Sequence, residues 1–335
     1  MTPAERDQLR LQQLAAQLEP ALRVAFLRFL NSLRPDQLPG LIARLESGDV
    51  AAVVDLIFGT AAVTAATAAL RSTFAEAMLR LVRTRSRDLS ASLRLTVEAP
   101  VFSPTLIQAV RRWEDDAFRR VLEDTRNGLR ETIAAELTRG IGPRQVAVAL
   151  KSDVSLAGLT AYDAKIVQSF REALEEGRVK DALGRALRDK RFDRALSGKA
   201  LKPEQIEKMV AAYRRKLVAF RAETFARTAA IQAANEASSE SWRAAVAQGA
   251  IPASEVKRYW IVAQDERLCK ICEPIPRMNP DGVALDGTFL TPVGPRMTAP
   301  VHPNCRCTTW VRRERAGVIR APQPGTTRLI LPRSA

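Results

Sequence analysis

The four cysteines and the single histidine of this 335-residue chain all lie between residues 269 and 307. They are Cys269, Cys272, His302, Cys305 and Cys307, so a Cys-x-x-Cys pair is followed, after a loop, by His-x-x-Cys-x-Cys. Two groups of soft ligands, each close in sequence and separated by a loop, are typical of a structural zinc site. Zinc takes four ligands in a tetrahedron, so the pattern predicts a metal bound by four of these five residues.

The choice of four ligands stays open at this point. Cys305 and Cys307 are two residues apart, so on a strand both face the same side and both can bind, with His302 as a supporting partner. Alternatively, His302 binds and one cysteine is spare. We favour Cys269, Cys272, His302 and Cys305, a closed set that leaves no position for water and is therefore structural rather than catalytic.

Other uses of the cysteines are less well supported. The first residues are polar and acidic, without the basic-then-apolar layout of a signal peptide, which predicts a cytoplasmic chain in which disulfides are rare. A thioredoxin-type redox pair needs a strand-to-helix turn, and the sequence around Cys269 does not suggest one. Four buried free thiols remain the plain alternative to zinc.

The single histidine also excludes most hydrolytic enzymes. A Ser-His-Asp triad would need His302, which lies inside the cysteine cluster. The zinc deaminase pattern is absent because Pro303 and Asn304 follow that histidine, and the chain has no phosphate-binding Gly-x4-Gly-Lys-Ser/Thr loop. Asp265 and Glu266 would face opposite sides of a strand, which argues against a catalytic carboxylate pair. We therefore expect no enzyme activity.

The residues before 250 are patterned for helices. Low aromatic content, 5%, leaves a core of Ala, Leu and Val that favours helix packing. One apolar face recurs at helical spacing at Leu11, Leu14, Leu18, Leu22, Ala25 and Phe29. Breakers at Pro20, Pro35, Pro39-Gly40 and Gly48 predict several short helices up to about residue 95. The apolar stretch 51–70 predicts a buried helix rather than a membrane span, and the basic run 80–87 predicts a solvated helix face.

Helix start and stop signals continue along the middle of the chain. Pro104 begins a helix that should run towards Leu137, and the Gly140–Pro143 segment ends it and starts another. The capping box at 160–163 predicts a helix that ends near Gly177. A long helix should run from Pro203 towards Gly249. Its apolar seam is expected at Ile206, Val210, Tyr213, Leu217 and Phe220.

After residue 251 the pattern changes to strands and loops. Strands are predicted at 257–263 and 306–311, with a short third at 288–290, and many Pro and Gly residues exclude long helices between them. A unit of about 60 residues has a marginal core, so a metal would add folding free energy. We expect Tyr259, Trp260, Phe289 and Trp310 to pack around the metal.

The fold class is therefore mainly α with a small C-terminal α+β zinc-stabilised module. The predicted regions are an N-terminal helical region at 1–100, helical hairpins and a long helix at 101–250, the Cys/His module at 251–313, and an extended basic tail at 314–335.

The chain is strongly basic, with 52 Lys and Arg against 37 Asp and Glu, a net charge of +15. Such a surplus attracts polyanions, and it is largest at the C-terminal end. We expect non-specific contacts with double-stranded DNA there. The arginines predicted to make them are Arg312, Arg313, Arg315, Arg320 and Arg328.

Residues from about 221 to 311 resemble the Mu F-like minor head protein family of tailed phages. The stretches that carry the resemblance are Ala226-Arg227-Thr228, Tyr259-Trp260, the segment 265–272 with its Cys-x-x-Cys, Asp286-Gly287, and Pro300-Val-His-Pro-Asn-Cys-Arg-Cys-Thr308. The last stretch is the most specific. The family often has an acid after the Arg-Thr pair, where this chain has Ala229.

The resemblance implies a structural virion protein of low copy number that is made in the bacterial host cytoplasm and lies inside the head near the portal. Its implied partners are the portal protein, the major capsid or scaffold protein and packaged DNA, with a role in head assembly or in genome packaging and delivery. No membrane partner is predicted. The alternative is a DNA-binding protein outside any capsid with a structural zinc site, although the chain has no recognition-helix signature.

Overall fold

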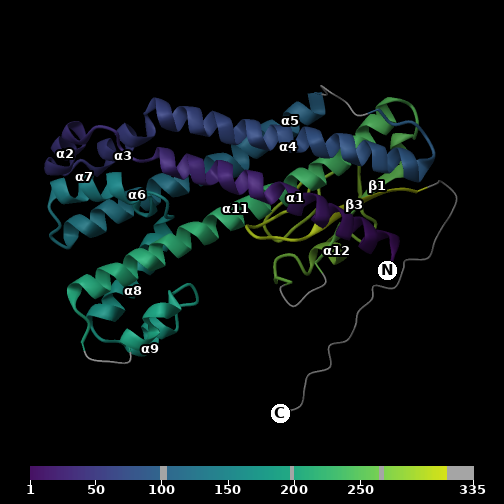
Figure 1. The fold of residues 1–335 in the computed structure, drawn as a ribbon. Coiled ribbons are helices and arrows are strands. Elements are labelled where there is room, and N and C mark those ends of the chain that lie inside the picture. The colour runs from purple at the N-terminus through teal and green to yellow at the C-terminus, as the bar shows by residue number, and fades with distance from the viewer. Residues whose placement is uncertain (99–103, 197–199, 264–267, 315–335) are drawn as a thin grey trace, which may run out of the picture.

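The computed structural model describes residues 1–98, 104–196, 200–263 and 268–314, and it shows an elongated helical body with a small sheet beside one end (Figure 1). The helices are α1 Pro3–Ser32, α2 Leu38–Glu46, α3 Val50–Phe58, α4 Ala61–Leu93, α5 Pro104–Trp113, α6 Arg119–Thr138, α7 Pro143–Ser152, α8 Ala161–Glu175, α9 Val179–Leu183, α10 Asp193–Leu196, α11 Pro203–Ala247 and α12 Ile275–Met278. The strands are β1 Val256–Ile261, β2 Val283–Ala284 and β3 Thr308–Arg313. The predicted fold class, mainly α with a small C-terminal α+β module, is confirmed.

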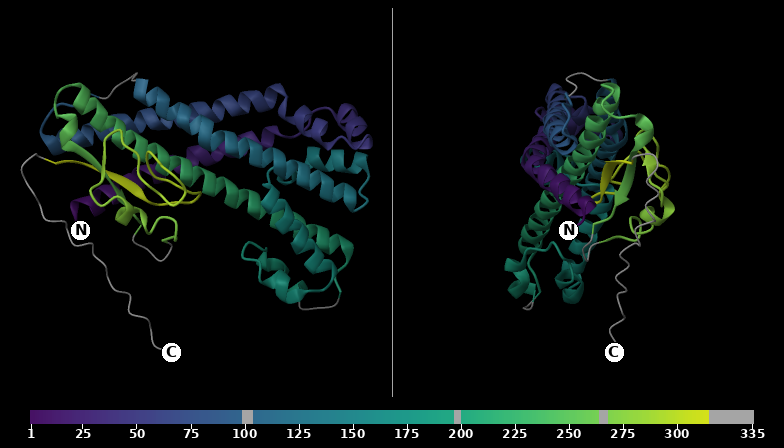
Figure 2. Two further views of the ribbon diagram at one scale, coloured as in Figure 1. Left: turned by 180° about the vertical axis from the view of Figure 1, so that it is seen from behind. Right: turned by 90° about the vertical axis from the view of Figure 1, so that its right-hand side faces the viewer.

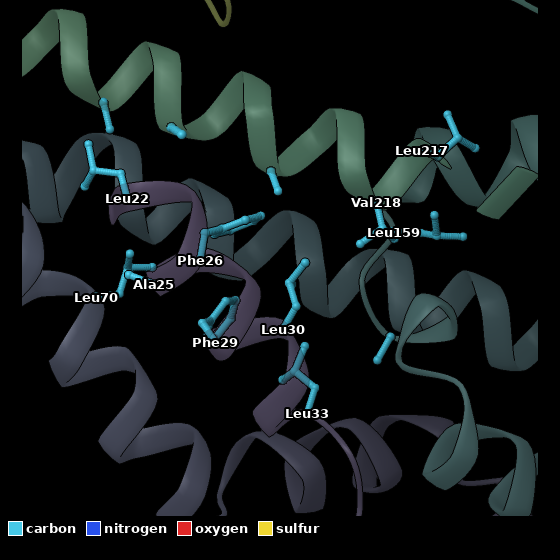
Figure 3. Packing of buried hydrophobic residues seen from close by; sticks show 14 of the residues in the cluster. Leu22, Ala25, Phe26, Phe29, Leu30, Leu33, Leu70, Leu159, Leu217 and Val218 are labelled. Carbon is cyan, nitrogen blue, oxygen red and sulfur yellow. The ribbon is translucent and has the colours of Figure 1, made fainter. Parts of the chain in front are cut away.

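The long helices α1, α4 and α11 pack against one another and hold most of the core. The predicted apolar face of α1 is confirmed, since all six of its residues are buried. Phe26 of α1 stacks on Phe225 of α11 with ring centroids 4.4 Å apart. Figure 3 shows Leu22, Phe26 and Leu30 of α1 between that helix and α11. This core includes residues from both sides of residue 100. The domain boundary expected at that residue stays a prediction.

Several expectations for the N-terminal region are wrong. Pro20 does not end a helix, because α1 continues through it to Ser32 with buried side chains before and after the proline. A proline removes one backbone hydrogen bond from a helix. Pro20 lies on the exposed side of α1, while the opposite face of the helix packs on the core. The basic run is also not wholly solvated, since Arg85 is buried and pairs with Asp7 at 2.7 Å.

The apolar stretch 51–70 is likewise not one helix. It is divided between α3 and α4 at Gly59, and the Thr60 hydroxyl caps α4 by accepting the amide N–H of Val63. Within the described residues, a single helix long and apolar enough to cross a membrane is not found; the bent pair α3 and α4, at 58° to each other, passes that test by length and composition.

The middle helices follow their sequence signals. The helix that begins at Pro104 reaches Thr138 through one π-helical turn at Glu114–Phe118, and Gly142-Pro143 starts α7. The capping box forms as predicted, because the Asp163 N–H donates to the Thr160 hydroxyl at 3.0 Å. The long helix α11 is also confirmed. Phe220, however, is 47% exposed, because a seam with a 3.5-residue repeat drifts around a helix with 3.6 residues per turn.

The sheet is antiparallel with the order β2-β1-β3, and Tyr259 of β1 faces Trp310 of β3. The expected strand at 288–290 is reduced to a single bridge between Phe289 and Arg296, and the third strand is β2 instead. β3 contacts both α1 and α11 (Figure 2). Pro3 and Arg313 line the same surface cavity of about 470 Å³, so the first helix and the last strand meet at one end of the body.

Candidate metal centre

The Cys-x-x-Cys segment forms a tight turn after β1. The Cys272 N–H lies 3.1 Å from the Cys269 carbonyl oxygen and 3.4 Å from the Cys269 Sγ. A backbone N–H that points at a sulfur is the arrangement that stabilises a thiolate. The turn leaves Cys272 buried and Cys269 at the edge of the site.

The second group of ligands lies on the turn that precedes β3. The Cys305 N–H donates to the His302 carbonyl oxygen at 3.3 Å. Asn304 adopts the left-handed conformation with φ of 61°, which asparagine tolerates better than most residues. Cys305 and Cys307 are both buried, and β3 begins at the next residue.

The two groups of ligands meet in space, although their sequences are separated by a long loop. His302 Nε2 lies 3.0 Å from Cys269 Sγ and 3.1 Å from Cys272 Sγ. Cys272 Sγ lies 3.7 Å from Cys305 Sγ. Zinc–sulfur bonds of about 2.3 Å give a tetrahedral edge of about 3.8 Å, close to this last distance.

The ligand atoms form two overlapping groups within which every pair is closer than 4.8 Å. One group is Cys269, Cys272 and His302, and the other is Cys272, Cys305 and Cys307. Either group could hold a metal ion. The five residues singled out from the sequence thus lie together in space, and the binding of a metal by four of them stays a prediction. The sharing of Cys272 makes that residue the centre of the cluster.

The orientation of His302 fits a metal ligand. Its Nδ1 lies 2.8 Å from the Pro303 carbonyl oxygen. A carbonyl oxygen only accepts, so Nδ1 donates its proton there and Nε2 presents a lone pair to the two sulfurs. Metal-binding histidines are commonly held in this way by a backbone carbonyl.

The thiols also favour an ionised ligand. Hydrogen bonds from Cys272 and Cys307 hold the pKa of the Cys305 thiol below its usual range, while the same contact with Cys305 raises the pKa of the Cys272 thiol. A thiolate is the form of cysteine that binds metals.

The expected aromatic surroundings are half correct. Trp260 and Phe289 belong to the buried cluster that contains the cysteines, with ring centroids 5.3 Å apart. Tyr259 and Trp310 lie instead on the other face of the sheet, where both rings contact the guanidinium of Arg312. Adjacent residues of a strand point to opposite faces, so Tyr259 and Trp260 could not both face the metal.

Side chains of α11 hold the turn that carries the candidate ligands; sequence reasoning named Arg227 and Thr228 only as part of the family resemblance, and it missed Asn235. The Arg227 guanidinium donates to the Asn304 Oδ1 at 2.8 Å, and the Asn304 N–H donates to the Thr228 hydroxyl at 2.8 Å. Asn235, fully buried, accepts the Thr309 N–H at 2.7 Å. The sequence signal that could have identified them is a set of polar residues on the same face of α11 as alanines that are buried.

Arg258 is another residue whose role sequence reasoning missed. It is fully buried in β1 and donates to the carbonyl oxygens of Gly287 and of Met297, the latter at 2.7 Å. Burial lowers the pKa of its guanidinium to about 10. This side chain ties the loop between β2 and β3 to the sheet, beside Phe289.

The arginines predicted to contact DNA have acidic neighbours where they are described. Arg312 pairs with Glu314, and Arg313 pairs with Glu255 at 2.6 Å. Arg315, Arg320 and Arg328 lie outside the described residues, as do Asp265 and Glu266. The DNA contacts stay a prediction.

No family model, curated protein or solved structure matches this chain.

Proposed function

We propose that this chain is a structural minor head protein of a tailed phage. The main support is the contact between two stretches that carry the resemblance to the Mu F-like family. Arg227 and Thr228 bind the turn residue Asn304 of the His-Pro-Asn-Cys stretch, although 76 residues separate Thr228 from Asn304. A family motif whose distant parts serve one site argues for the resemblance more strongly than separate matches would.

The site is proposed to hold zinc through Cys269, Cys272, His302 and Cys305, with Cys307 as the spare thiol. Thiolates and a neutral imidazole are ligands that suit zinc. The metal would stabilise the small C-terminal module, whose cysteine cluster has few large apolar side chains. Purified protein should contain about one zinc per chain, measured by elemental mass spectrometry, and a chelator should lower its melting temperature. Metal-free protein with unchanged stability would refute the structural role.

The proposed partners are the portal protein, the major capsid or scaffold protein and packaged double-stranded DNA, in a virion assembled in the host cytoplasm. Its proposed place is inside the head near the portal, with a role in head assembly or in genome packaging and delivery, and without enzyme activity. The net charge of +15 supports a place among packaged DNA. The elongated helical body supports assembly contacts along its length.

The deciding experiment is affinity capture of the tagged protein from its native host during particle production, with quantitative mass spectrometry of what co-purifies. Recovery of portal and major capsid protein in excess over the bait supports the proposal. Recovery of host proteins and DNA alone would favour the alternative, a DNA-binding protein outside any capsid. An untagged strain run in parallel sets the background.

The proposed DNA contact has a separate test in gel shifts with random-sequence duplexes. Binding by neutralised phosphates weakens steeply as salt rises, because each contact releases counterions. We expect a complex at low salt that is lost as salt increases. The absence of a complex at low salt, or binding that salt does not change, would contradict this part of the proposal.

A further inference from the structure

The loops that carry the metal ligands are held by polar side chains of two helices far away in sequence. On α1, Gln8 donates to the Val262 carbonyl oxygen at 3.1 Å and Gln12 donates to the Arg306 carbonyl oxygen at 3.0 Å. Arg306 lies between Cys305 and Cys307, so the α1 contact falls inside the ligand segment.

The contacts of α11 lie equally close to the ligands. Asn304, held by Arg227 and Thr228, stands between His302 and Cys305. Asn235 donates to the Ala299 carbonyl oxygen at 3.3 Å and accepts the N–H of Thr309, so one amide joins the chain before His302 to the strand after Cys307. Asn235 and Thr309 are both fully buried. A buried amide leaves polar groups unpaired if this geometry changes, which makes the arrangement costly to disturb.

These hydrogen bonds are the direct connection between the metal ligands and the helices. The buried cluster that contains the cysteines is built from β1, α12 and the loops of the module, and among the described residues it includes no side chain of α1 or α11. A second cluster, with Trp242 of α11, Val256 and Val311, joins the far part of the sheet to the helix. The ligand turn itself is therefore placed by polar contacts rather than by a shared apolar core.

We infer that Arg227, Thr228 and Asn235 are positioning residues for the metal, and that metal binding and the docking of the ligand turn on α11 and α1 are thermodynamically coupled. This inference rests on the metal binding proposed above. Thermodynamic coupling is reciprocal. If docking of the ligand turn on the helices raises the metal affinity by some factor, bound metal raises the equilibrium constant for docking by the same factor. The metal would thus stabilise the joint between module and helical body, as well as the module.

The first test measures zinc affinity of full-length protein by competition with a chromophoric chelator. Thr228→Val keeps the shape and β-branching of the side chain but removes the acceptor for the Asn304 N–H. Loss of a residue that orients metal ligands typically weakens affinity by about tenfold or more, and we expect that for this variant. Thr228→Ser, which keeps the hydroxyl, should restore the affinity.

Thr224→Val is the matched control, since Thr224 lies one turn earlier on α11 and its hydroxyl forms no hydrogen bond among the described residues. Its zinc affinity should stay within about twofold of wild type. A general loss of helix stability would lower both valine variants alike, whereas a positioning role separates them.

The reverse direction of the coupling is measured by hydrogen exchange of the wild type with and without zinc. Removal of zinc should speed exchange at Asn304 and also around residues 224–236 of α11, and the zinc-dependent change on α11 should shrink in Thr228→Val. Equal zinc affinity of Thr228→Val and wild type, or exchange on α11 that ignores zinc, would overturn the coupling while leaving zinc binding intact. A wild-type protein that binds no zinc would overturn both.

Discussion

Cys272 belongs to both ligand groups and is therefore the cysteine that the cluster can least replace. Its Sγ is within 3.7 Å of Cys305 Sγ and 3.1 Å of the His302 imidazole. Cys307 shares a group with Cys272 and Cys305 only. Zinc needs four ligands and five candidates are present. Single substitutions of these residues should therefore differ in how much they reduce zinc binding.

Cys272→Ser is expected to lose bound zinc, because serine is a poor zinc ligand and no remaining cysteine joins the two groups. Cys307→Ser should keep close to one zinc per chain, as a spare thiol would. Elemental mass spectrometry on both purified variants checks this, with folding followed by circular dichroism. Loss of zinc from Cys307→Ser but not from Cys269→Ser would instead show that Cys307 is a ligand and Cys269 is the spare.

The candidate ligands could be found from the sequence because cysteine and histidine are rare in it and their spacing is informative. Asn235 and Arg258, which hold the loops around them, could not be found in this way. Asn235 is one polar residue among many on α11, and Arg258 occupies a strand position that alternation marks as buried without saying what would satisfy its charge. Their roles depend on carbonyl oxygens that only the folded loops bring near.

Gly128 marks the closest approach between two helical elements. A Cβ placed on this residue of α6 would lie 1.9 Å from the Leu159 carbonyl oxygen, immediately before α8. Backbone cannot move aside as a flexible side chain can, so the contact requires glycine. Gly40 in α2 offers a contrast, because its nearest neighbour would be the end of the Arg44 side chain at 3.6 Å.

Gly128→Ala should therefore destabilise the protein by about 2 kcal/mol or more, even though alanine favours a helix by about 1 kcal/mol. Gly40→Ala should be neutral or slightly stabilising for the same propensity. Urea unfolding of the two variants beside wild type measures both. Equal stability of Gly128→Ala and wild type would mean that α6 and the 158–160 segment can separate without cost.

An ion-pair network joins α8 and α6 to the start of α11. The buried Arg171 makes two hydrogen bonds to Glu207, which also accepts from Arg139 at 3.1 Å. The hydrogen bond from Arg171, and the positive charges of both arginines, lower the pKa of Glu207 from its ordinary value of 4.5 despite the opposing effect of burial. A carboxyl whose pKa is lowered by folding adds stability above its unfolded pKa and loses it as the pH falls through the folded value.

Glu207→Gln should cost about 1 kcal/mol near pH 7, a modest figure because the carboxylate is half exposed and screened by solvent. The difference from wild type should be full above about pH 5 and shrink as the pH falls below 4.5. Thermal unfolding at several pH values checks the trend. A stability difference between Glu207→Gln and wild type that grew towards low pH would contradict a lowered pKa for Glu207 in the folded protein.

Helix boundaries could be predicted where capping residues act locally, as at Thr160, Pro143 and Pro203. The predictions of helix boundaries were wrong where packing outweighed a local sequence signal. Pro20 reads as a breaker, yet the buried face around it keeps α1 in one piece. The division of the 51–70 stretch at Gly59-Thr60 was overlooked because the stretch was treated as one apolar run, although glycine followed by a capping threonine is itself a helix stop and start signal.

At the scale of the whole molecule, the N-terminal helices supply a large share of the core around α11. Seven large apolar side chains of α1 alone are buried: Leu11, Leu14, Leu18, Leu22, Phe26, Phe29 and Leu30. At about 2 kcal/mol for each, their burial is comparable with the total stability of an average domain, about 5–15 kcal/mol. The two predicted helical regions are therefore energetically interdependent.

A fragment of residues 101–335 should fail to fold cooperatively. Circular dichroism during heating should show weak helicity without a sharp transition, and co-expression of residues 1–100 as a separate chain should restore it. A fragment that melts sharply near the temperature of the full chain would establish the boundary at residue 100 as a true domain boundary.

Pro3 and Arg313 line one cavity, so the start of α1 and the end of β3 lie at the same end of the molecule. Any fusion partner, affinity tag or fluorophore joined before α1 or after β3 departs from the end that carries the cysteines. The opposite end, with α2, α3 and α7, can be reached only through an internal loop such as the one at Gly48. In a larger assembly, a label at Pro3 or directly after Arg313 would thus report the position of the same end of the molecule.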